Sequence, residues 1–327
     1  MPPNQRKDKS WVLFACGLNA GAILLLLVVL AVYFVRQPAE AAPAPVPTGL
    51  LQSPPRPTRT PAPTSFYLPT VTPNPLATLI EDYSTPTPFV FSNGPTPIVI
   101  GYSVQGRPID VYTFGQGESL YLIVAGIHGG YESNTVDLAN QLIVYITDHP
   151  DVIPSAATLY LVNDMNPDAV ARGRNADARV NANGVDLNRN FPTTNWVADW
   201  EHGNCWNERP TTGGAYGGSE PETKTIMNFI LSRHIQAMIS YHSAALGVFP
   251  GGDPWQPASE QLAGALSDVT GYPYPPIDIG CVYTGTLADW AVQNGVGAAV
   301  DMELSTHQDS DFSKNLKALK VLLNFGE

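Results

Sequence analysis

Positive charge is scarce in this chain of 327 residues. Its 17 lysines and arginines face 29 aspartates and glutamates, which gives a formal net charge of −12. The first 96 residues hold six of the basic and four of the acidic side chains, so the remainder holds 11 basic and 25 acidic ones. Such an excess of acid repels phosphate groups and argues against nucleic acid as a partner.

Cysteine is also scarce, since the chain has only three. Cys16 lies within an apolar run, which leaves Cys205 and Cys281 for the rest of the chain. In an oxidising compartment two such cysteines can pair. We therefore predict an intramolecular disulfide between Cys205 and Cys281. The sequence has no internal repeat.

One long apolar run is present, at residues 11–35, and it contains no charged residue. A helix rising about 1.5 Å per residue would cross a hydrocarbon core of about 30 Å over this length. Basic residues dominate the charge of residues 1–10, which favours a cytoplasmic N-terminus and an exported remainder. We predict an uncleaved signal-anchor helix in the cell membrane. The alternative is a signal peptide cleaved after Ala41, which would give a secreted form.

Proline, threonine and alanine dominate residues 36–97, as in "PAPAPVPTG" and "PPRPTRTPAPT". Proline removes backbone donors and disfavours helix, so this segment is predicted to be a disordered, extended linker without a core. Residues 98–327 have the size of one large domain.

Strands alternate with helices along this domain. Short apolar runs rich in β-branched residues predict strands, and longer periodic segments predict helices. The predicted strands are 98–102, 109–114, 121–125, 158–162, 237–241 and 297–304, and the predicted helices are 134–147, 220–234, 259–270 and 311–323. Ser219 and Glu222 form the pattern of a capping box at the second helix. The alternation predicts an α/β fold with a mixed, mainly parallel sheet flanked by helices.

Side chains that bind metals follow three of the predicted strands. His128 and His242 each come after a strand, and Glu303 lies near the end of another. Functional sites of such sheets gather at the carboxyl ends of the strands. Two histidines, a carboxylate such as Glu132 and an open position make a catalytic zinc site. Each residue alone has an ordinary structural explanation, so the joint placement carries the prediction.

Six motifs strengthen this interpretation. They resemble zinc metallocarboxypeptidases of the carboxypeptidase A superfamily, in order and in sequence, over nearly all of residues 98–327. The motifs are "GIHGGYE", "NPDAVARGR", "GVDLNRNF", "GGSEPET", "MISYHS" and "DMEL". The resemblance implies that family's sheet, of an eight-stranded type, and one zinc ion per domain.

The resemblance also implies roles around the metal. His128, Glu132 and His242 would be the zinc ligands. Asp186 would accept the other ring N–H of His128 and fix its tautomer. Glu303 would act as general base toward water activated at the metal.

Substrate-binding roles follow from the same resemblance. Asn188 and Arg189 would bind the terminal carboxylate of the substrate, which suits the arginine fork. Tyr283 is similar to a mobile tyrosine that closes over substrate, or else packs as an ordinary aromatic. An upstream arginine would stabilise the oxyanion. The unusual spacing of "ARGRNADARVNANG" leaves this last role open among three residues, with preference for the second and third: Arg172, Arg174 and Arg179.

One spacing departs from the family pattern. The family has two residues between the first histidine and the glutamate, whereas three residues separate His128 from Glu132 here. Two of the three are glycines, which would let the backbone absorb the extra residue. If the loop cannot adapt, a zinc-free binding module becomes the alternative.

The predicted function is that of a membrane-anchored zinc carboxypeptidase that acts outside the cytoplasm on peptides. The short domain and its "RVNANGVDLNRNFP" passage also resemble bacterial members that trim peptidoglycan peptides. A γ-D-glutamyl-diaminopimelate amidase with a muropeptide substrate is therefore the alternative within the same reaction class. Ala288, near the family's specificity position, offers no acid to attract a basic terminal residue.

Overall fold

The computed structural model describes residues 95–198 and 211–326. The predicted membrane helix and nearly all of the predicted linker lie outside this part of the chain. Within the part that is described, no helix combines the length and the apolar character needed to cross a membrane. Cys281 is disulfide-bonded, whereas Cys205, its predicted partner, lies outside the described residues.

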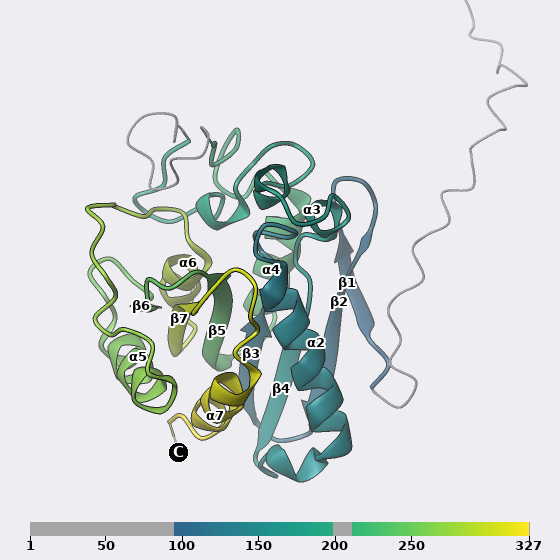
Figure 1. Cartoon of the computed structure of the whole chain (residues 1–327), viewed down its shortest axis with the longest axis vertical. Coiled ribbons are helices and arrows are strands. Elements are labelled where there is room, and N and C mark those ends of the chain that lie inside the picture. Colours follow the sequence, from purple (N-terminus) through teal and green to yellow (C-terminus); the bar gives the residue numbers. More distant parts are fainter. Residues whose placement is uncertain (1–94, 199–210, 327) are drawn as a thin grey trace, which may run out of the picture. The chain divides into compact units, whose positions relative to one another are not determined.

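Seven strands form one mixed sheet in the described residues, in the order β1-β2-β4-β3-β5-β7-β6 (Figure 1). The central pairings β3–β4, β3–β5 and β5–β7 are parallel, while β1–β2, β2–β4 and β6–β7 are antiparallel. The strands are β1 (Ile98–Tyr102), β2 (Pro108–Gly115), β3 (Ser119–Val124), β4 (Ala157–Val162), β5 (Ile235–Ser243), β6 (Val248–Pro250) and β7 (Ala298–Leu304).

The prediction of a mixed α/β sheet is confirmed, but the expectation of eight, mainly parallel strands is not met in the described part of the chain. The antiparallel pairings come from the β1–β2 hairpin, which turns at Gly106, from the pairing of β2 with β4, and from the short return strand β6. Gly106 has a φ of +78°, a left-handed conformation that glycine adopts without strain.

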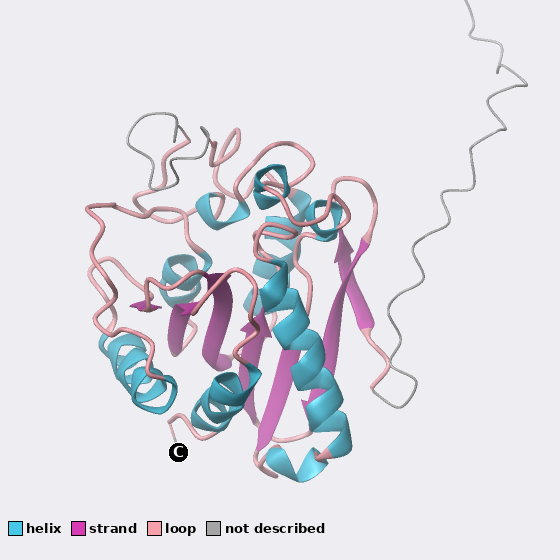
Figure 2. Ribbon diagram, viewed as in Figure 1, coloured by secondary structure: helices cyan, strands magenta, loops and turns pink. Residues whose placement is uncertain are grey.

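Helices cover both faces of the sheet (Figure 2). One apolar core joins the sheet to α2, α5 and α7, and a second core joins the opposite face to α4 and α6. The helices are α2 (Ser133–Asp148), α3 (Pro167–Val170), α4 (Pro221–Leu231), α5 (Pro257–Thr270), α6 (Leu287–Gln293) and α7 (Phe312–Leu323). Short 3₁₀ helices are η2 (Pro150–Val152), η3 (Ala176–Arg179) and η4 (Leu187–Arg189).

The predicted capping box of α4 is wrong. The helix begins at Pro221, and Glu220 occupies the N-cap position without a side-chain cap bond. The Ser219 hydroxyl donates instead to Glu220 at 2.6 Å. Glu222 is buried and accepts a hydrogen bond from the backbone N–H of Val104 at 3.0 Å. Ser219 therefore bonds to its chain neighbour and Glu222 to the distant turn after β1, so neither side chain caps the helix.

Parallel pairing fixes which side chains meet at the carboxyl edge. In the β5–β7 register Ser240 lies opposite Asp301, and His242 lies opposite Glu303. Successive strand side chains point to opposite faces, so these four residues share the face that carries α4 and α6. The strand ends therefore present them beside the loop that follows β3 and contains His128.

Candidate metal centre

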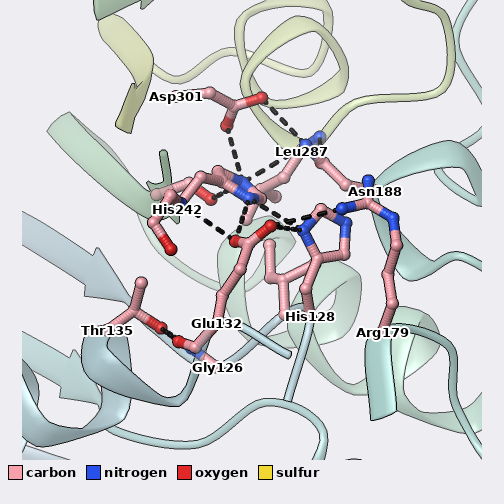
Figure 3. Close-up of polar contacts among 12 residues, drawn as sticks. Gly126, His128, Glu132, Thr135, Arg179, Asn188, His242, Leu287 and Asp301 are labelled. Atoms are coloured by element: carbon pink, nitrogen blue, oxygen red, sulfur yellow. Dashed lines mark hydrogen bonds and ion pairs between the residues drawn. The ribbon is translucent and has the colours of Figure 1, made fainter. Parts of the chain in front are cut away.

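Two histidines and a glutamate meet at the carboxyl edge of the sheet, with their ligand atoms within 4.8 Å of one another (Figure 3). All three side chains are buried. Nδ1 of His242 lies 3.3 Å from Nδ1 of His128 and 3.3 Å from Oε2 of Glu132. Oε1 of Glu132 lies 2.7 Å from Nδ1 of His128.

This donor set fits zinc. Imidazole nitrogens and a carboxylate are the ligands of catalytic zinc sites, and tetrahedral bonds of about 2.0–2.2 Å separate ligand atoms by about 3.3 Å. Both separations at His242 match that spacing. The backbone N–H of Ser243 donates to Oε2 of Glu132 at 3.1 Å and orients this carboxylate.

The extra residue between His128 and Glu132 is accommodated as a helical turn. The backbone N–H of Tyr131 donates to the carbonyl of His128 at 3.1 Å, and that of Glu132 donates to the same carbonyl at 3.4 Å. Residues four apart on a helical turn lie on the same side. The departure from the family spacing therefore leaves both side chains directed at one point.

Glycine is required in this turn. Gly129 has a φ of +43°, and a Cβ atom there would lie 2.2 Å from Cβ of Ala169. A Cβ atom on Gly130 would lie 2.2 Å from the carbonyl oxygen of Gly173. The turn packs directly against α3 and the loop after it, so neither glycine position has room for a side chain.

Asp186 ties several site residues together. Its Oδ1 lies 3.0 Å from Nε2 of His128 and accepts the backbone N–H of Asn188 at 3.0 Å. Its Oδ2 accepts from Nε of Arg179 at 3.0 Å, and Nη1 of this arginine donates to Glu132 at 3.2 Å. Burial alone would raise the pKa of Asp186, but the charges of Arg179 and His128 hold that pKa well below its usual value. With a metal bound, the ionised carboxylate would hold the proton on Nε2, and Nδ1 would be the ring nitrogen that binds the metal.

The three candidate arginines lie in different places. Arg179 is buried beside the ligand set. Arg174 is about half exposed, and its ion pair with Asp137 at 2.6 Å holds it away from the ligands. Arg172 donates to backbone carbonyls of the segment 177–181. The structure thus brings Arg179 to the site and does not bring Arg174.

Asn188 and Arg189 lie in η4, directly after Asp186. The Asn188 side chain accepts the backbone N–H of Leu287 at 2.8 Å, which directs its amide nitrogen toward His242 at 3.2 Å. Arg189 is buried, and Nη1 donates to the carbonyl of Asn188 at 2.7 Å. The ring of Tyr283 lies 5.1 Å from the guanidinium carbon, a cation–π distance.

Glu303 faces the ligand set from β7. Its Oε2 is buried and accepts no hydrogen bond from a described residue. Burial, together with the negative charge of Glu132, raises the pKa of Glu303 to about 8. A carboxylate with an unsatisfied oxygen beside a metal site is suited to exchange protons with water or substrate.

Further residues belong to the site although the sequence patterns do not single them out. Asp301 accepts from the Asn188 amide at 3.1 Å. Its sequence signals were its place in the "DMEL" motif and its spacing of two from Glu303, which puts both on one face of a strand. His307 is the second such residue. Its ring lies 4.9 Å from that of Tyr131, and its Nδ1 lies 3.1 Å from the hydroxyl of Ser243, which follows His242.

The chain is similar in sequence to known proteins. The sequence model of a family described as zinc carboxypeptidase matches residues 91–320. Murein peptide amidase A of Escherichia coli (strain K12) is 37% identical over 126 residues, which cover 37% of this chain and 48% of that protein. The carboxypeptidase N catalytic chain of Rattus norvegicus is 33% identical over 98 residues, covering 27% and 21% of the two chains. The chain therefore spans about half the length, or less, of these two relatives.

Solved structures share the fold. The crystal structure of murein-tripeptide amidase from Escherichia coli O157 has a TM-score of 0.54 at 24% identity, covering 71% of this chain and 93% of that chain. Bovine thrombin-activatable fibrinolysis inhibitor, in complex with tick carboxypeptidase inhibitor, has a TM-score of 0.57 at 20% identity, covering 71% and 90%. Because both identities are below 25%, these structures establish a shared fold and nothing further.

Substituting Gly130 tests the helical turn. We expect Gly130→Ala to weaken zinc binding by about 10-fold or more, because the new Cβ displaces the turn that carries Glu132. Competition with a chelator measures the affinity. The control is Gly264→Ala in α5, where the nearest atom to a new Cβ is 3.8 Å away. It should bind zinc as the wild type does, and equal affinities in both variants would contradict the role of the turn.

Proposed function

The chain belongs to the zinc carboxypeptidase family, and we propose that it is a zinc-dependent amidase that acts on murein peptides. It is a hydrolytic enzyme, as its relatives are. The name murein peptide amidase A recurs among the curated relatives, at 37% and 33% identity. The general carboxypeptidase activity predicted from the sequence has the weaker support, since the match to the rat carboxypeptidase N chain covers 27% of this chain.

One observation carries the proposal that a terminal residue is released. Arg189 is buried and follows Asn188 directly in the chain, and the Asn188 amide nitrogen lies 3.2 Å from Nε2 of His242. A guanidinium fork binds a carboxylate with two parallel hydrogen bonds. Arg189 and Asn188 would hold the free carboxylate of a terminal residue, so that the amide bond before this residue reaches the metal. Terminal diaminopimelate of a murein peptide offers such a carboxylate.

The chemistry divides among the site residues. A zinc ion bound by His128, Glu132 and His242 supplies a Lewis acid. Glu303 takes a proton from the attacking water and passes it to the leaving amine. Arg179 stabilises the negative charge that develops on the carbonyl oxygen.

Two further proposals concern the surroundings of the site. Tyr283, beside Arg189, closes over the bound substrate. The apolar run at residues 11–35 anchors the protein in the cell membrane, and the linker at residues 36–97 extends the catalytic domain outside the cytoplasm. An inactive binding module is not proposed, because the chain belongs to a family of hydrolytic enzymes and retains Glu303.

Mass spectrometry of peptide digests tests the proposed activity. The purified protein is incubated with a murein tripeptide that ends in diaminopimelate and with an ordinary peptide that ends in leucine. Release of diaminopimelate without release of leucine supports the amidase. Preferred release of leucine supports a general carboxypeptidase instead, and cleavage of neither overturns the proposal.

Substituting the proposed base separates chemistry from metal binding. We expect Glu303→Gln to reduce kcat by about 10²-fold or more, because an amide cannot accept the proton. Zinc content should stay at the wild-type value, since Glu303 is not a ligand. Elemental analysis and initial rates measure the two quantities. A variant that retains wild-type turnover would remove Glu303 from the mechanism.

A pair of arginine variants tests the oxyanion role. Arg179→Ala is expected to lower kcat by about 10²–10³-fold, the loss typical of one oxyanion donor. Arg174→Ala is the matched control and should stay close to the wild-type rate, because exposed ion pairs contribute little. Zinc content of both proteins shows whether Arg179 acts through the ligands. Similar rates for the two variants would contradict the assignment.

A further inference from the structure

Two buried carboxylates flank the two histidines. Asp186 faces His128. Asp301 faces His242 from the neighbouring strand β7 (Figure 3). Asp301 is 8% exposed and lies opposite Ser240 in the parallel register. The role of Asp186 follows from its hydrogen bonds, whereas Asp301 has no part in the chemistry proposed for the site.

The two oxygens of Asp301 have different surroundings. Oδ2 accepts a hydrogen bond from the amide nitrogen of Asn188 at 3.1 Å. Oδ1 is buried, accepts no hydrogen bond from a described residue, and lies 3.7 Å from Nε2 of His242. One carboxylate therefore faces both a metal ligand and the amide proposed to bind substrate.

The ligand set decides where His242 carries its proton. Nδ1 points at His128 and Glu132, so its lone pair is the one available to a metal. Nε2 then carries the hydrogen and must donate it, because an unpaired buried N–H is costly.

Few acceptors lie near this N–H. The Asn188 nitrogen, 3.2 Å away, is itself a donor, since Asn188 uses its oxygen to accept from Leu287. The Ser240 hydroxyl lies 3.1 Å away and the Asp301 carboxylate 3.7 Å away. Of these two, Asp301 alone brings negative charge, which strengthens an imidazole as a metal ligand.

We propose that Asp301 is a positioning residue that fixes His242 as a zinc ligand with one oxygen and Asn188 as a substrate-binding amide with the other. The part that concerns His242 rests on the ligand set. The part that concerns Asn188 rests on the proposed function. Because one carboxylate serves both, it links zinc affinity to substrate affinity.

Two substitutions separate the two oxygens. Asp301→Asn keeps an oxygen for Asn188 and turns an N–H toward His242, whereas Asp301→Ala removes both acceptors. For Asp301→Asn we expect a zinc dissociation constant about 10-fold above wild type and a wild-type KM for the murein tripeptide at saturating zinc. For Asp301→Ala we expect the same loss of zinc affinity and a KM about 10-fold higher.

Asp289→Asn is the matched control. Asp289 is also buried, lies in α6, and accepts the backbone N–H of Gly252 at 2.7 Å. This variant removes the same charge without touching His242 or Asn188, so its zinc dissociation constant and its KM should equal those of the wild type. If Asp289→Asn lost as much zinc affinity as Asp301→Asn, the cause would be the loss of negative charge in general. This result would overturn the proposal.

Chelator competition measures zinc affinity without substrate, and circular dichroism of the zinc-free proteins checks their folding. Wild-type zinc affinity in Asp301→Asn overturns the role toward His242. Equal KM values in wild type and Asp301→Ala overturn the role toward Asn188. If Asp301→Ala does not fold, Asp301→Val removes the same two acceptors, and a wild-type KM in that variant overturns the role toward Asn188. If no substrate is cleaved by the wild type, the proposed function fails while the zinc measurement still decides the role toward His242.

Discussion

Parallel pairing of β3, β5 and β7 is the constraint on which the site depends. The backbone register places His242 beside Glu303 and brings both next to the loop after β3. No side-chain interaction has to draw these residues together, because the ladder hydrogen bonds of three strands already do so. The helices on both faces bury the strands and thereby hold this register in place.

Charge balance explains how so many ionisable groups stay buried at one edge. Glu132 and Asp186 carry negative charge, and Arg179 contacts both at 3.2 and 3.0 Å. A buried charge without such a partner would be costly. The same arrangement places Arg179 beside the candidate metal ligands, where it can take the role proposed for it in the reaction. Arg179 and Glu132 thus belong both to the ion pairs of the site and to the groups proposed for its chemistry.

Much of the fold was predictable because its central strands are apolar and its long helices are periodic. The elements that escaped prediction are short, such as β6 with three residues and α6 with seven, and such lengths show no clear period. The capping box at Ser219 failed because a distant backbone N–H, that of Val104, took Glu222 instead. Local patterns cannot register a partner 118 positions away.

The sequence by itself determined the family, the α/β class and the ligand candidates His128, Glu132 and His242, since motifs and strand ends are local features. Only the tertiary structure decided that three intervening residues form a helical turn which directs Glu132 toward His128 and His242. It also separated Arg179 from Arg174 and revealed Asp301. These outcomes depend on packing against Ala169, Asp137 and Asn188, which contact the site across the fold. Such contacts depend on the folded chain and cannot be predicted from the spacing of residues in the sequence.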